Sequence, residues 1–277
     1  IYPIHPTAET VSGLRASPTL ADTPDPVDYA YIAIGADRIP PMLAAAKGRV
    51  KFAQVISAGF GEVEQGVDLQ SNLTAAARDG GCRLIGPNCL RLHTPRWHVS
   101  FAKNVSRELG TVGVISQSGG LGTDIVKRGQ GRGLRFSGVL TVGNSADLGP
   151  NDFLEYYLAD AQTKVVGMYL EDVKDGRRFA RILRDAKAGK PVVILKGGGT
   201  SQGQRAAASH TGSLAGDDRV WDALATQTGC VLTDTLDQFL EALLAFQCMA
   251  PRADRPTRRV VLFGNGGGTS VLATDFF

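Results

Sequence analysis

A histidine set among small residues is the most chemically suggestive feature of the sequence. His210 lies in the segment Ser209-His210-Thr211-Gly212-Ser213-Leu214-Ala215-Gly216. Small neighbours leave the imidazole ring accessible, as a nucleophile that attacks phosphorus requires. The hydroxyls of Ser209 and Thr211 and the backbone N–H groups near Gly212 could hold phosphoryl oxygens. The segment therefore predicts a phosphate-carrying histidine, although a lone loop histidine is more often a surface or capping residue.

A glycine turn between a predicted strand and a predicted helix is the second candidate. Gln117-Ser118-Gly119-Gly120 follows a strand over 111–116 and precedes a helix over 121–131. A helix N-terminus presents unpaired N–H groups and a partial positive charge, so it attracts phosphate. Gly119 and Gly120 would let phosphate approach the backbone closely. A serine N-cap in a tight turn explains the same residues equally well.

Two further segments come directly after predicted strands. Glu171 follows a strand over 165–170, at the carboxyl end, where active-site groups collect in open α/β sheets. Its carboxylate could accept the N–H of a histidine ring and fix the tautomer, or it could cap a helix that begins near Asp175. Gly86-Pro87-Asn88-Cys89 ends a strand over 82–86, and a rigid turn is the favoured interpretation of a Pro-Asn pair.

Alternating strands and helices must position these residues. Such alternation predicts parallel sheets with helices on both faces. In the first part of the chain, strands are expected at 29–35, 52–59 and 82–86 and helices at 39–47 and 67–79. In the second part, strands are expected at 111–116, 136–142, 165–170, 192–196 and 231–232, with helices at 121–131, 152–158, 177–188, 215–228 and 236–248.

The two ends of the chain suggest incomplete units. Residues 1–4 read as a strand with no strand, turn and helix before them, so we expect the first strand and glycine-rich loop of a dinucleotide-type domain to be missing. Residues 251–257 (PRADRPT) read as a linker, and residues 259–263 as a new strand.

Composition excludes several function classes. The net charge of +3 comes from scattered basic residues, which argues against nucleic-acid binding. Membrane association is not expected either, because there is no signal peptide and no apolar run of spanning length. The four cysteines lie far apart without metal-ligand spacing, so neither a metal site nor a disulfide framework is expected. Reduced thiols suit a cytoplasmic protein.

Several motifs taken in order resemble the NDP-forming acyl-CoA synthetases, which include the ADP-forming acetyl-CoA synthetases and the alpha subunit of succinyl-CoA synthetase. The resemblance covers nearly the whole chain. Its motifs are Tyr2-Pro3-Ile4-His5-Pro6, Ile56-Ser57-Ala58-Gly59-Phe60, Ile85-Gly86-Pro87-Asn88-Cys89-Leu90, Ile115-Ser116-Gln117-Ser118-Gly119, Tyr169-Leu170-Glu171, Lys196-Gly197-Gly198 and Ala208-Ser209-His210-Thr211-Gly212-Ser213.

The resemblance implies a domain plan. Residues 1–107 would form an N-terminally incomplete, Rossmann-like CoA-binding domain, and residues 108–250 a flavodoxin-like, doubly wound domain that carries the phosphohistidine. Residues 251–277 would be a linker and the start of a second flavodoxin-like domain. A family ATP-grasp module, on the same full-length chain or on a partner subunit, would handle ATP or ADP with its Mg²⁺, and a homo- or hetero-oligomer is implied.

The implied reaction interconverts acyl-CoA, ADP and phosphate with a small carboxylic acid, CoA and ATP. His210 would carry the phosphoryl group, Glu171 would orient its ring, and Ser118, Gly119, Gly120, Ser209, Thr211 and Gly212 would hold phosphate. Pro87, Asn88 and Cys89 would belong to the CoA and active-site loop.

Two departures from the family pattern bear on these roles. Without its glycine loop the chain should bind CoA poorly, and Arg91, where many relatives have glycine, opens an unfamiliar stretch 91–106 around the acyl pocket. A relative that couples acyl-CoA formation to a step such as elimination, or an inactive sensor of CoA or nucleotide, remains the alternative.

Overall fold

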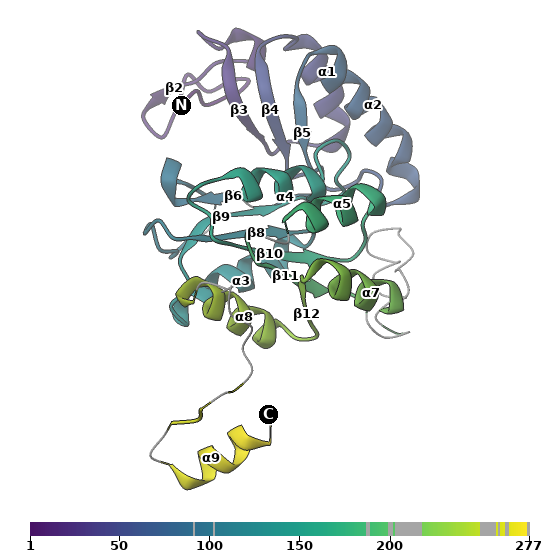
Figure 1. Ribbon diagram of the computed structural model, residues 1–277. Helices are drawn as coiled ribbons and strands as arrows, with labels where there is room; N and C mark the ends of the chain where they lie inside the picture. Colours follow the sequence, from purple (N-terminus) through teal and green to yellow (C-terminus); the bar gives the residue numbers. More distant parts are fainter. Residues whose placement is uncertain are drawn as a thin grey trace.

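Three parallel strands form the sheet of the first α/β unit (Figure 1). The computed structural model describes residues 1–90, 92–101, 103–186, 189–198, 202, 218–249, 259, 261–263 and 266–275. The sheet contains β3 (Val27–Ile32), β4 (Val50–Val55) and β5 (Arg83–Ile85), with helices α1 (Ile39–Ala45) and α2 (Val67–Asp79) packed against it. A small hairpin, β1 (Thr10–Val11) and β2 (Leu14–Arg15), precedes them.

The strand expected at residues 1–4 does not form. Ile4 makes only an isolated bridge to Ser17, outside the three-stranded sheet. Pro3 lies within this segment and has no backbone N–H, so the segment cannot donate along its whole length as a strand of a sheet does.

A seven-stranded sheet organises the second unit. Its order is β12-β11-β10-β8-β9-β6-β7, and β8 to β12 are parallel. If these five parallel strands are numbered along the chain, the order is 2-1-3-4-5, as in flavodoxin-like folds. The strands are β6 (Leu92–Thr94), β7 (Val99–Ser100), β8 (Val112–Ser116), β9 (Phe136–Thr141), β10 (Val165–Leu170), β11 (Val192–Lys196) and β12 (Val231–Thr233).

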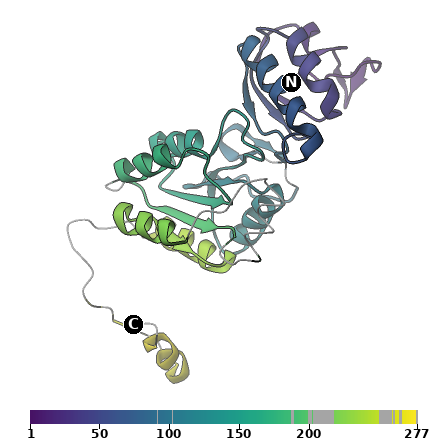
Figure 2. The same ribbon diagram turned by 90° about the vertical axis from the view of Figure 1, so that its right-hand side faces the viewer.

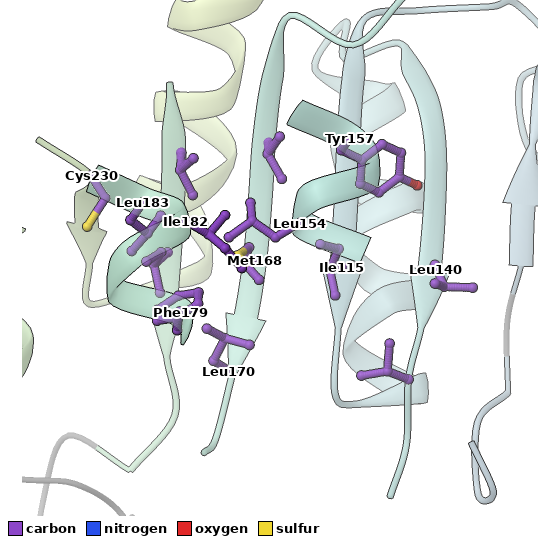
Figure 3. Packing of buried hydrophobic residues seen from close by; sticks show 14 of the residues in the cluster. Ile115, Leu140, Leu154, Tyr157, Met168, Leu170, Phe179, Ile182, Leu183 and Cys230 are labelled. Carbon is purple, nitrogen blue, oxygen red and sulfur yellow. The ribbon is translucent and has the colours of Figure 1, made fainter. Parts of the chain in front are cut away.

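Helices cover both faces of this sheet (Figures 1 and 2). On one face, α3 (Gly119–Gly131) and α8 (Leu236–Cys248) bury a cluster that includes Ile125 and Phe239. On the other face, α4 (Pro150–Ala159), α5 (Gly176–Ala186) and α7 (Asp218–Thr228) pack against the sheet. The cluster buried there includes Ile115, Leu154 and Met168 (Figure 3). Because helices cover both faces of the sheet, side chains on both sides of each strand are buried. The strand sequences are therefore near-continuous hydrophobic runs.

Residues 92–100 differ from the expected domain plan. The sequence put them in the first unit, with a boundary near residue 107, but β6 pairs antiparallel with β9 and β7 pairs with β6. Two short antiparallel strands with only one 3₁₀ turn (Pro95–Trp97) between them lack the alternation of strand and α-helix on which the expected boundary rested.

The C-terminal segment also differs. Residues 259 and 261–263 form no strand, and the next described element is helix α9 (Gly267–Thr274). Val261 and Phe263 are almost fully exposed, so no described neighbour pairs with this segment or covers it. No helix in the described part of the chain is long and apolar enough to cross a bilayer.

Candidate functional site

The site residues of the second unit meet where the strand order reverses. Central strands β8 and β10 are adjacent, with Ser116 opposite Tyr169. The chain leaves β8 for α3 on one face and β10 for α5 on the other, and such a reversal is the place where open α/β sheets bind their ligands. Residues 117–120 and 171–172 lie at this point. The structure thus brings together Ser118, Gly119, Gly120 and Glu171, which the sequence predicted separately.

Glu171 is held firmly at the end of β10. It is 6% exposed, and Oε1 accepts a hydrogen bond of 3.0 Å from the Tyr169 hydroxyl. Burial, together with the negative charge and hydrogen bond of Glu171, raises the pKa of Tyr169, which therefore stays protonated and donates at neutral pH. The carboxylate cannot swing freely, which suits a group that must orient a partner ring.

Gln117 links the carboxyl ends of β8 and β10 by hydrogen bonds. Its side-chain oxygen accepts from the backbone N–H groups of Glu171 and Asp172, and Nε2 donates to the Asp172 carboxylate at 2.6 Å. These bonds fix the Glu171 backbone relative to the turn that opens α3. Gln117 and Tyr169 lie inside motifs singled out from the sequence, but sequence reasoning gave them no role because hydrogen bonds across strands leave no signal along the chain.

Ser118 is the N-cap of α3. Its backbone is extended, with φ −95° and ψ 125°, and Oγ accepts from the Leu121 N–H at 3.2 Å. Ser118 therefore caps the helix, and this cap is compatible with phosphate binding at the same turn. The N–H groups of Gly119 and Gly120 stand at the first two helical positions, where no intrahelical acceptor exists, so they can donate to an anion.

The two glycines of this turn have different neighbours. A Cβ on Gly119 would lie 2.8 Å from the Leu90 Cβ, whereas a Cβ on Gly120 would have only the Ser118 Oγ nearby, at 4.0 Å. Gly119 is therefore needed first for packing against Leu90. A bulky residue at position 119 would therefore disturb the fold.

The predicted phosphate carrier lies outside the described residues. Ser209, His210, Thr211 and Gly212 belong to the undescribed range 203–217. Gly197 directly follows β11, and a Cβ there would lie 3.1 Å from the Glu171 Cγ. Gly197 therefore lies next to the Glu171 side chain. α7 precedes parallel strand β12, so its N-terminus also lies toward the carboxyl edge of the sheet.

Pro87 and Asn88 lie in a turn that faces the second unit. The Gly86–Pro87 peptide bond is cis, and Asn88 adopts a left-handed conformation with φ 56°. The Pro87 carbonyl accepts from the Asn144 N–H at 3.0 Å, and the Asn88 side chain donates to the Asn144 side chain at 3.4 Å. A rigid turn, the interpretation favoured from the sequence, describes the segment, and the turn joins the two units.

Cys89 is a core residue in this structure. It is fully buried, and Sγ contacts the carbonyl oxygens of Val55 and Ile85, each at 3.3 Å. Burial raises the pKa of its thiol to about 12, so the group is neutral and shielded. Cys89 therefore supports the 86–89 turn from the core, and its thiol is not accessible to a substrate. Among the described residues, no three His, Cys, Asp or Glu side chains are placed to hold a metal ion.

Comparison with known proteins assigns both units. A model of the CoA binding domain matches residues 1–95, and a model of the succinyl-CoA ligase like flavodoxin domain matches residues 109–246. The alpha subunit of acetate–CoA ligase (ADP-forming) II from Pyrococcus furiosus is 36% identical over 99% of this chain and 60% of its own length. The 4-hydroxybutyrate–CoA ligase (ADP-forming) of Nitrosopumilus maritimus is 34% identical over 99% of this chain and 40% of its own length.

A solved structure agrees with these matches. The dinucleotide forming acetyl-coenzyme A synthetase 1 of Ca. Korarchaeum cryptofilum, in complex with phosphate and ADP, superimposes with a TM-score of 0.89 at 33% identity. The superposition covers 99% of this chain and 59% of that one. The chain therefore spans about 40–60% of the length of these relatives.

Proposed function

Because the chain belongs to the family of NDP-forming acyl-CoA synthetases, of which it forms the alpha part, we propose that it supplies the acyl-transfer and phosphohistidine half of an acid–thiol ligase. The complete enzyme would interconvert acyl-CoA, ADP and phosphate with a carboxylic acid, CoA and ATP. One observation carries the proposal: a buried, oriented carboxylate and a helix N-terminus with two available N–H groups meet at the switch point of a flavodoxin-like sheet.

The first step of the proposed reaction takes place at the junction of the two units. Phosphate attacks the thioester carbonyl, and the bond to sulfur breaks to give an acyl phosphate and CoA. Pro87 and Asn88 would contact the acyl-CoA there, since their turn faces the second unit. Cys89 supports that turn from the core rather than reacting.

The second step moves the phosphoryl group to His210. A ring nitrogen of His210 attacks phosphorus, and the carboxylate of the acid leaves. The N–H groups of Gly119 and Gly120 would hold the phosphoryl oxygens, with the hydroxyls of Ser118, Ser209 and Thr211 and the backbone of Gly212 around them. Glu171 would accept the other ring N–H and stabilise the positive charge that develops on the imidazole.

The third step needs residues beyond this chain. The loop that carries His210 would deliver the phosphoryl group to ADP, with Mg²⁺ accompanying the nucleotide on an ATP-grasp module. Relatives named as alpha subunits support a separate or fused remainder of this kind. The protein's own contribution is positioning and charge stabilisation, which are the main terms in phosphoryl transfer.

The experiment is product analysis of the complete enzyme with a panel of acyl-CoA esters, ADP and phosphate. The proposal expects ATP, free acid and CoA in equal amounts, and loss of ATP and free acid with His210→Ala. A product with an altered acyl skeleton would indicate coupling to elimination. Binding of CoA or nucleotide without turnover of any ester would indicate an inactive sensor. Either result would overturn the proposed ligase.

A further inference from the structure

The turn between β9 and α4 is shaped by its contact with the first unit. Gly143 and Ser145 both adopt left-handed conformations, with φ 50°. A Cβ on Gly143 would lie 2.3 Å from the Pro87 carbonyl oxygen and 2.4 Å from that of Asn88. Only glycine fits there, because the turn lies directly on the Pro87–Asn88 segment.

Asn144, at the centre of this turn, bonds to three segments of the first unit. Its N–H donates to the Pro87 carbonyl at 3.0 Å. Its side-chain Nδ2 donates to the Glu62 carboxylate and, at 3.0 Å, to the Gln70 side-chain oxygen. Glu62 is itself fixed by the backbone N–H groups of Gly59 and Phe60. Asn144 is thus one of the residues that join the two units.

Lys174 holds the same turn from the other side. It lies three residues after Glu171, on the turn between β10 and α5. Its Nζ donates to the carbonyl oxygens of Asn144 at 2.7 Å and Ser145 at 3.0 Å. Charge-assisted bonds of this length are stronger than neutral ones, and they stabilise a turn in which two residues have positive φ. Hydrogen bonds therefore link Lys174, three residues beyond Glu171 in the chain, through Asn144 to Asn88.

We propose that Lys174 is a positioning residue that acts through Asn144 to hold the Pro87–Asn88 turn in register with the Glu171 phosphoryl site. The inference rests on the proposed function and adds that its two phosphoryl transfers depend differently on this link. Phosphorylation of His210 by ATP uses only the second unit and the nucleotide module, so it does not need this link. Transfer between His210 and the acyl group spans both units, so it does.

The test compares Lys174→Met with Lys190→Met in the complete enzyme. Lys190 is a matched control, because its Nζ also donates to two backbone carbonyls, those of Tyr157 and Asp160. It precedes β11 and so lies at the amino ends of the strands, away from the Glu171 turn. Two rates are measured in single turnovers: labelling of the enzyme by γ-labelled ATP, and discharge of the labelled enzyme by acetate plus CoA, or by the acid and CoA found in the product analysis.

The expected result for Lys174→Met is labelling within about twofold of wild type and discharge slowed at least about tenfold. Lys174→Arg, which keeps the charge and the donors, should recover part of the discharge rate. Asn144→Ala should slow discharge similarly, and the double variant should be no slower than the worse single one, since both residues act through one link.

Three outcomes would overturn the inference: normal discharge in Lys174→Met, an equal loss of labelling and discharge, or the same defect in Lys190→Met. Thermal unfolding of each variant shows whether a general loss of stability explains the change. Failure of the proposed function itself would look different, because wild-type enzyme would then carry no label at all.

Discussion

At the scale of single residues, Glu171 has surroundings that suit an orienting role better than a capping role. The sequence left both open. In the structure its carboxylate accepts from Tyr169 and is buried at the strand end, and it is the Asp175 side chain that accepts from the N–H of Arg178 in the first turn of α5. The first turn of α5 is thus capped by Asp175 and not by Glu171.

Replacing this carboxylate tests the role. Glu171→Gln keeps the shape and removes the charge, so labelling of the complete enzyme from ATP should slow on the order of a hundredfold, as for other histidine-orienting carboxylates. Tyr169→Phe is the control: it removes one hydrogen bond but keeps the charge, and a much smaller effect is expected. Rapid-quench labelling gives both rates. Equal labelling of Glu171→Gln and wild type would rule out the orienting role.

The two glycines that open α3 give a second prediction at this scale. An added methyl at position 119 meets Leu90 at 2.8 Å, so Gly119→Ala should destabilise the fold by about 1–3 kcal/mol. At position 120 the methyl meets no such contact, so Gly120→Ala should leave stability unchanged or raise it by up to about 1 kcal/mol. Urea unfolding of the pair measures the difference, and equal midpoints would contradict the packing described here.

At the scale of elements, the sequence was a good guide wherever a strand or helix has its own local signal, either a continuous apolar run or a helical apolar period. Expected and observed bounds coincide for α2, β10, β11 and α8. The missed strands β6 and β7 are three and two residues long, and they form because β6 pairs with the edge of β9 and β7 pairs with β6. Pairing between distant segments leaves no periodicity in so short a stretch.

The contact between the two units was not foreseeable for the same reason. Asp147 illustrates it: its carboxylate accepts from the Arg83 side chain at 2.9 and 3.0 Å and from the Leu84 N–H at 2.8 Å. Burial alone would raise the pKa of Asp147, but these hydrogen bonds outweigh it and hold the pKa below the ordinary value. The residue therefore pins the β9–α4 segment to β5.

This lowered pKa predicts a pH-dependent stability. A carboxylate with a lower pKa in the folded state stabilises the protein above its unfolded-state pKa, near 4, and loses that contribution as the pH falls through the folded-state value. Asp147→Asn should therefore cost about 1 kcal/mol at pH 7. The difference from wild type should shrink on acidification below about pH 4. Urea titrations across this range measure it, and a difference that grows toward low pH would contradict the assignment.

At the scale of the whole molecule, the proposed function assigns the two sheets of the chain to different halves of one reaction. The sequence supplied the fold class and the switch-point residues, because strand ends and glycine turns are local signals. It could not supply Gln117, Asn144 or Lys174 as links, since each acts through residues at least 29 positions away in the chain. Family likeness supplied the reaction, which neither pattern nor geometry alone identifies.

The central claim is that His210 carries the phosphoryl group, and direct labelling tests it. The complete enzyme is incubated with γ-labelled ATP and Mg²⁺, digested, and the labelled peptide is sequenced by mass spectrometry. The account predicts label on the peptide containing Ser209-His210-Thr211, lost in acid and retained in base, and absent from His210→Ala. Undiminished labelling of His210→Ala, or label on any other residue, would contradict it.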